Sequence, residues 1–133
     1  MKNSPHISRT VWIVDDDPIA RLLIKKTVER SDLFDLSQEF TDGVDIIEAL
    51  ESIGNKETKE PDLILLDINM PDKDGWEVLD FIREQNISLR KAKLVLLTSS
   101  INPKDKAKAF GFDSVNGFLN KPLAKEDLES LNL

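Results

Sequence analysis

The sequence predicts an α/β fold in which one open parallel sheet carries helices on both faces. Short apolar runs alternate with amphipathic segments along most of the chain, a pattern typical of strands joined by crossover helices. Two runs, Val11–Val14 and Leu63–Leu66, are apolar throughout, as expected for strands that are buried on both faces. At 133 residues the chain has the length of one domain with its own core.

The first unit joins the strand Val11–Val14 to a helix. Asp17 is placed to cap this helix, and Pro18 suits its first position because a missing N–H costs little there. The pattern ends at Ser31–Asp32. Apolar and small residues expected on the inner face recur at helical spacing: Ala20, Leu23, Ile24, Thr27 and Val28.

The second and third units follow the same order of strand and helix. Leu36–Phe40 is expected to be a short strand, and Asp42–Gly43 leads into a helix with an inner face of Val44, Ile47 and Leu50. A charged loop, Gly54–Pro61, precedes the third strand, Leu63–Asp67. The helix after Gly75 has a buried stripe of Val78, Leu79 and Ile82.

Two further units complete the predicted sheet. The fourth strand is Leu94–Thr98, and Asn102–Pro103 has the capping signals of a helix that runs to about Phe110–Gly111. Phe118–Leu119 is expected to be a short fifth strand, and Ala124–Leu131 a last helix. The chain therefore contains five strand–helix units.

Composition and charge exclude several classes of protein. The chain has no cysteine, which excludes disulfide scaffolds and thiolate metal sites, and its single histidine, His6, argues against histidine-based catalysis. No apolar stretch approaches the roughly 20 residues of a membrane helix, and no secretory signal is present, so a cytoplasmic location is expected. A net charge of -7 argues against direct binding of nucleic acid.

Chemically useful side chains fall at the carboxyl ends of the predicted strands. Because ligands of open parallel sheets bind beyond these ends, the side chains are expected to share one crevice. The aspartates would repel one another there, which makes best sense with a bound divalent cation. The residues are Asp15, Asp16, Asp67, Thr98 and Lys121.

The chain resembles the receiver domain of two-component response regulators from Val11 to Leu131. The matching motifs, in order, are Val14-Asp15-Asp16, Leu66-Asp67-Ile68-Asn69-Met70-Pro71, Asp74-Gly75, Leu97-Thr98-Ser99-Ser100 and Lys121-Pro122. The resemblance implies a flavodoxin-like sheet of strand order 2-1-3-4-5. It also implies a stand-alone receiver at residues 9–133, without an output domain, after a flexible tail at 1–8.

By this resemblance, Asp67 accepts a phosphoryl group from the phosphohistidine of a sensor histidine kinase or a histidine phosphotransfer protein. Magnesium, with Mn2+ as the alternative ion, would be bound by Asp16, Asp67 and the backbone carbonyl of Asn69, and by Asp15 through water. Such a protein promotes its own phosphorylation and slow hydrolysis and is not an enzyme with a separate substrate.

Other residues are assigned to the phosphoryl group and to signalling. Lys121, the Thr98 hydroxyl and backbone N–H groups of Asn69 and Ser99 would hold the phosphoryl oxygens. A shift of Thr98 and a turn of Phe118 would then remodel the face formed by the fourth helix, the fifth strand and the fifth helix. The readout is a downstream protein target, with a monomer or a phosphorylation-dependent dimer as the active form.

Two features depart from the usual receiver pattern. Phe118 replaces a frequent tyrosine, so packing and not hydrogen bonding would define its two rotamers. Residues 112–117 make a longer connection than usual, predicted to be a protruding loop in which Phe112 and Val115 contact a partner or pack underneath it. The resemblance also implies a cis bond between Lys121 and Pro122.

Two other functions are alternatives to the interpretation of this chain as a phosphoacceptor. An aspartyl-phosphate phosphatase would also use a strand-end aspartate and magnesium, but Asn69 stands where its second aspartate is expected, which leaves no general acid. A receiver-shaped interaction module that is never phosphorylated would not need the intact acidic group, Thr98 and Lys121. Among the other residues, Asp17 is interpreted as a helix cap, and Trp12 and Trp76 as structural or partner-facing.

Overall fold

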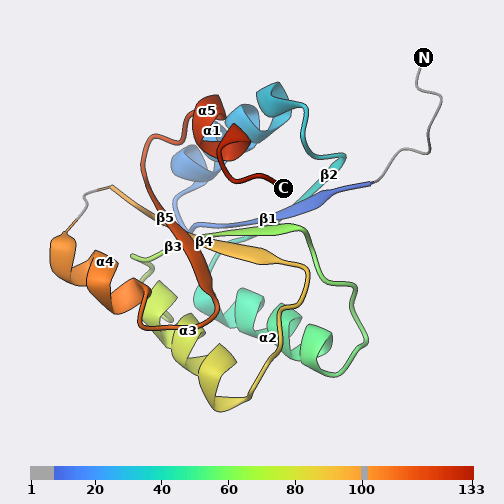
Figure 1. The fold of residues 1–133 in the computed structure, drawn as a ribbon, viewed down its shortest axis with the longest axis vertical. Helices are drawn as coiled ribbons and strands as arrows, with labels where there is room; N and C mark the ends of the chain where they lie inside the picture. The colour runs from blue at the N-terminus through green and yellow to red at the C-terminus, as the bar shows by residue number, and fades with distance from the viewer. Residues whose placement is uncertain (1–7, 100–101) are drawn as a thin grey trace.

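The strands form one parallel sheet, shown in Figure 1, in the order β2-β1-β3-β4-β5. The computed structural model describes residues 8–99 and 102–133, so nearly all of the predicted tail, with His6, and the motif residue Ser100 lie outside the described residues. The predicted fold class and strand order are confirmed. The strands are β1 (Thr10–Val14), β2 (Leu36–Phe40), β3 (Leu63–Asp67), β4 (Lys93–Thr98) and β5 (Val115–Asn120).

Helices cover both faces of the sheet (Figure 1). One face packs against α1 and α5 through alternate strand residues such as Val11, Ile13 and Leu65, and the other packs against α2, α3 and α4. Because both faces are covered, β1 and β3 are apolar almost throughout, as the sequence predicts. The helices are α1 (Pro18–Ser31), α2 (Gly43–Gly54), α3 (Gly75–Glu84), α4 (Pro103–Ala109) and α5 (Lys125–Glu129).

Side-chain caps fix the starts of most of these helices. Asp17 accepts a hydrogen bond from the N–H of Ile19, which confirms that it caps α1 ahead of Pro18. Asn102 caps α4 in the same way, ahead of Pro103. The predicted start of α1, directly after the acidic segment Asp15–Asp17, is therefore encoded in local sequence.

Three details of the helices differ from the predictions. Val44 is exposed, because the face of α2 that packs against the sheet carries Ile46 and Leu50 and Val44 lies outside it. Leu23 is exposed on α1, next to the exposed Leu22. The last helix is shorter than expected, and α5 ends at Glu129.

The prediction of a protruding loop at residues 112–117 is wrong, because residues 115–117 belong to β5 and only residues 112–114 form a turn before it. Asn116 is an extra residue in the pairing of β5 with β4, and its side-chain Oδ1 accepts a hydrogen bond of 2.8 Å from the N–H of Leu94. Phe112 and Val115 are each only 8% exposed, so the packing alternative is confirmed for both side chains.

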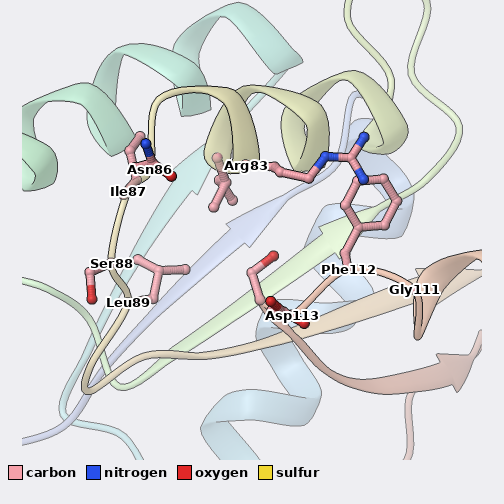
Figure 2. Close-up of a pocket in the computed structure, with 10 residues that line it drawn as sticks. Arg83, Asn86, Ile87, Ser88, Leu89, Gly111, Phe112 and Asp113 are labelled. Carbon is pink, nitrogen blue, oxygen red and sulfur yellow. The ribbon is translucent and has the colours of Figure 1, made fainter.

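Phe112 belongs to a column of aromatic and cationic side chains that links α3 to α4. Its ring stacks on Trp76, with 6.4 Å between the ring centroids. The guanidinium carbon of Arg83 lies 4.5 Å from the centroid of Phe112, a contact visible in Figure 2. At the other end, Lys108 Nζ lies 4.4 Å from the centroid of Trp76. We refer to these four residues as the aromatic column.

The hollow drawn in Figure 2 is not lined by Asp15, Asp16 or Asp67. It has a volume of about 360 Å3 and is lined by residues from the end of α3, from the loop that follows it and from the turn before β5, including Ser88, Asp113 and Phe112. Among the described residues, no helix is long and apolar enough to cross a membrane.

Candidate functional site

The ends of β1 and β3 bring the aspartates together. The two strands are neighbours, and Val14 pairs with Leu66, so the residues that follow, Asp15 and Asp67, leave the sheet side by side. Carboxylate oxygens of Asp15, Asp16 and Asp67 lie within 4.8 Å of one another. Asp15 and Asp67 are buried, whereas Asp16 is exposed. We refer to these three residues as the acidic cluster.

Lys121 is the cation that faces the acidic cluster. It follows β5, and its Nζ donates a hydrogen bond of 2.7 Å to Asp15 Oδ2 and lies 3.3 Å from Asp67 Oδ1. Its backbone N–H donates to the carbonyl of Thr98 at 2.7 Å, which fixes the end of β5 against the end of β4. The peptide bond between Lys121 and Pro122 is cis, as predicted.

Burial and charge shift the titration of both groups. The pKa of Asp67 is raised from its ordinary value of 3.8 to about 6, because burial and then the charge of Asp15 raise it by more than Lys121 and the N–H of Asn69 lower it. Burial lowers the pKa of Lys121, but the hydrogen bond and charge of Asp15 together with the charge of Asp67 outweigh this effect, so its pKa rises above the ordinary value. The ammonium therefore remains charged, and the cluster retains unbalanced negative charge.

The backbone after Asp67 is held closely against the start of α3. Gly75 donates its N–H to the carbonyl of Ile68 at 2.8 Å, and a Cβ atom at Gly75 would lie 2.8 Å from the Cα of Ile68. Only glycine fits at this approach, so Gly75 lets the backbone after Asp67 pass close to the start of α3. Within the same loop, the N–H of Asn69 points at Asp67 Oδ1, 3.4 Å away.

The family of the chain follows from its match to known proteins. A family model described as the response regulator receiver domain matches residues 11–131. The chain belongs to the response regulator receiver family. Receivers are signalling domains of two-component systems and interact with histidine kinases and downstream targets.

Individual relatives of the receiver support the same family. The nitrate/nitrite response regulator protein NarL of Escherichia coli is 33% identical over 119 residues, which make up 90% of this chain but 50% of NarL. Response regulator Rcp1 of Synechocystis is 31% identical over 129 residues, covering 96% of this chain and 86% of Rcp1. The receiver thus spans about half of NarL and most of Rcp1.

Solved structures of similar proteins share the whole fold of the receiver. A two-component response regulator from Cytophaga hutchinsonii superimposes with a TM-score of 0.86 and 30% identity, over 96% of each chain. The Mn2+-bound form of Rcp1 superimposes with a TM-score of 0.72 and 30% identity, over 92% of this chain and 88% of that chain.

Thr98, Ser99 and Phe118 lie at different distances from the acidic cluster along the sheet. Thr98 is the buried last residue of β4, and the exposed Ser99 follows it. Phe118 lies within β5, paired in register with Leu96, and packs half-buried against the core on the α3 and α4 side. The ends of β3, β4 and β5 thus place Asp67, Thr98 and Lys121 at one edge of the sheet, with Phe118 farther inside.

The acidic cluster has the donors that a hard divalent cation requires. Three carboxylates in close reach supply oxygen ligands, and the repulsion from Asp15, which adds to burial in raising the pKa of Asp67, is relieved when a cation binds. The described residues contain no cysteine thiolate and no histidine imidazole, the ligands that would favour a softer metal. The residues present therefore fit Mg2+ or Mn2+.

Arg21 is a contact of this site that the sequence analysis missed. Its guanidinium donates from Nη1 to the carbonyl of Asp15 at 2.7 Å and from Nε to Glu39 Oε1 at 3.0 Å. A cationic residue one turn after the cap Asp17, with an acidic residue near the end of the second predicted strand, is a signal in the sequence that could have indicated it.

Proposed function

We propose that the receiver accepts a phosphoryl group on Asp67 from a phosphohistidine of a sensor histidine kinase or a histidine phosphotransfer protein. The observation that carries this proposal is the position of one buried carboxylate, Asp67, within 3.3 Å of Lys121 and in close reach of the carboxylates of Asp15 and Asp16. A receiver domain at residues 9–133 and a cytoplasmic location belong to the same proposal.

In the proposed transfer, an oxygen of Asp67 forms the new bond to phosphorus while the bond between phosphorus and the donor imidazole nitrogen breaks. The electron pair of that bond stays with the imidazole, and the product is an acyl phosphate that water later hydrolyses. Lys121 holds a fixed positive charge where the phosphoryl oxygens arrive, because its ammonium already faces Asp67.

The proposed ligands of the divalent ion are carboxylates of Asp16 and Asp67 and the carbonyl of Asn69, with Asp15 acting through water. The ion, when bound, neutralises charge on the transferred group. The indirect role of Asp15 is supported by its existing bonds, since Oδ1 accepts from the N–H of Asp17 at 2.9 Å and Oδ2 accepts from Lys121. The exposed Asp16 accepts neither the N–H of Asp17 nor the ammonium of Lys121.

The remaining phosphoryl oxygens are assigned to hydrogen-bond donors around the acceptor. These are the Thr98 hydroxyl and the backbone N–H groups of Asn69 and Ser99. The N–H of Asn69 already points at Asp67, which supports its part in the proposal. With Asn69 at that position, no general acid is at hand for steady turnover of phosphate esters, so the receiver acts as a signalling protein.

Signalling is proposed to run through Thr98 and Phe118. A shift of Thr98 toward the phosphoryl group would leave space for Phe118 to turn inward, and the surface of α4, β5 and α5 would change for a downstream protein. Phe118 lies two residues from the end of β5 and has no hydroxyl, so its two positions would differ in packing alone. When two conformations differ in free energy by only about a few kcal/mol, one charged modification is enough to reverse their populations.

A protein donor needs a surface beside Asp67, and α1 supplies one. Ile19, Leu22 and Leu23 are large apolar side chains that are at least half exposed on the first turns of this helix. A hollow of about 330 Å3 between α1 and the segment after β5 continues this surface to Lys121 and Pro122. We place the phosphohistidine donor on this side of the molecule.

Labelling with acetyl phosphate and Mg2+ tests the proposal. Intact-mass analysis should find one added phosphoryl group on the wild-type protein, none on Asp67→Asn, and one on the control Asp72→Asn, which changes an exposed carboxylate in the following loop. Chelation of Mg2+ should prevent the addition. Wild-type labelling of Asp67→Asn would overturn the assignment, and steady hydrolysis of p-nitrophenyl phosphate would favour a phosphatase.

A further inference from the structure

Arg21 links three elements around the acidic cluster. It lies in the first turns of α1, and its side chain is only 16% exposed. One arm of its guanidinium reaches the carbonyl of Asp15 at 2.7 Å, and Nε reaches the carboxylate of Glu39, near the end of β2, at 3.0 Å. A surface ion pair alone would not require the contact with the carbonyl.

The contact with the carbonyl completes a full set of hydrogen bonds around Asp15. Its N–H donates to the carbonyl of Phe40 at 3.1 Å, and its two carboxylate oxygens accept from Asp17 and Lys121. With Arg21 on the carbonyl, every polar group of Asp15 has a partner. The residue is therefore fixed from β2, from α1 and from the end of β5.

The direction of Asp16 depends on this arrangement. Its peptide N belongs to the same peptide unit as the Asp15 carbonyl, so a donor on that carbonyl orients the plane from which Asp16 departs. The next residue, Asp17, is held by its bond to Asp15 and by its role as the cap of α1. Asp16 is exposed between two fixed neighbours.

From these contacts we infer that Arg21 is a positioning residue, which holds the segment Asp15–Asp17 in the conformation that presents Asp16 to a divalent cation. This inference rests on the proposed function, because it assigns a role at the same metal site. The charge of Arg21 and its positioning role have opposite effects on the affinity of the site for the ion. A guanidinium beside a cation site weakens binding of the ion by repulsion, whereas a fixed ligand strengthens it.

Titration calorimetry with Mg2+ on the purified full chain separates the two effects. Arg21→Met keeps the aliphatic stem but removes both hydrogen bonds, and we expect its Kd for Mg2+ to rise about 10-fold. The matched control is Arg30→Met, the same change at an exposed position of α1, which should keep the wild-type Kd. Arg21→Lys, which retains the charge but cannot form both hydrogen bonds, to the carbonyl of Asp15 and to Glu39, should also bind Mg2+ more weakly than wild type.

Each outcome decides between the alternatives. An unchanged or lower Kd in Arg21→Met, or a wild-type Kd in Arg21→Lys, would overturn the inference. Urea unfolding in chelator shows whether the variants are folded, and a purely structural role of Arg21 would lower stability without changing the Kd of the folded protein. If Arg21→Met does not fold, Arg21→Lys alone decides. Failure of the wild-type protein to bind Mg2+ would instead refute the proposed function.

Discussion

The ammonium of Lys121 is hydrogen-bonded to the carboxylate of Asp15, with 2.7 Å between Nζ and Oδ2. Asp67 lies slightly farther from the same ammonium, at 3.3 Å. Lys121 is therefore held beside the proposed acceptor by a neighbouring carboxylate, Asp15, to which the proposal assigns no phosphoryl group. In the proposed function, this arrangement separates two tasks within one small site, the binding of the cation and the stabilisation of the transferred group.

Replacement of Lys121 should separate these tasks in an experiment. In Lys121→Met we expect Mg2+ to bind at least as tightly as in wild type, because a repelling charge is removed. Labelling by acetyl phosphate should slow at least about 10-fold, because a donor to the phosphoryl oxygens is lost. Calorimetry and intact-mass time courses measure the two effects, with Lys125→Met on α5 as an exposed control. Wild-type labelling of Lys121→Met would contradict the assigned role.

The raised pKa of Asp67 predicts a pH-dependent stability in the absence of metal. The folded protein holds the Asp67 proton up to about pH 6, whereas the unfolded chain releases it near the ordinary value of 3.8. Stability contributed by this group is therefore complete below pH 3.8 and is lost as the pH rises to about 6. Asp67→Asn should remove this loss.

Urea unfolding in chelator at pH 4, 5 and 7 tests that prediction. The free energy of unfolding of Asp67→Asn should exceed that of wild type by about 3 kcal/mol at pH 7, with a much smaller difference at pH 4. Saturating Mg2+ should reduce the difference at pH 7, because the ion stabilises the wild-type carboxylate. A difference that does not change between pH 4 and pH 7 would show that Asp67 titrates normally.

Phe112 should behave as a core residue. Phe112→Ala removes a ring that is 8% exposed and stacked between Trp76 and Arg83, so we expect a loss of about 3 kcal/mol in the free energy of unfolding. Phe110→Ala is the matched control, since that ring is 52% exposed and should cost less than about 1 kcal/mol. Equal losses in the two variants, measured by urea unfolding, would mean that Phe112 is not held as described.

The convergence of Asp15 and Asp67 could be predicted from the sequence because it depends on strand polarity alone. Two apolar runs that each end in aspartate must place those aspartates at the same edge of a parallel sheet. The caps Asp17 and Asn102 were equally predictable, because a capping bond spans only two or three residues. Local signals of this kind do not depend on the rest of the fold.

The start of β5 could not be predicted because its pairing partner decides it. The stretch from Val115 contains Asn116 and Gly117, which favour turns when taken alone. In the fold, the side chain of Asn116 bonds to the backbone of Leu94 and turns the extra residue into part of the ladder. Similarly, Arg21 was missed because its partners, the carbonyl of Asp15 after β1 and the carboxylate of Glu39 in β2, are brought to it only by the pairing of these two strands.

The aromatic column gives the receiver an optical probe of its own. Trp76 follows Gly75, whose N–H donates to the carbonyl of Ile68, the residue directly after Asp67. The indole of Trp76 also faces Lys108 of α4. Only one other tryptophan, Trp12, is present, and it is buried in β1. A change in intrinsic tryptophan fluorescence on phosphorylation would thus report movement between the loop after Asp67 and α4 without any attached dye. Trp12→Phe would leave Trp76 as the sole tryptophan emitter.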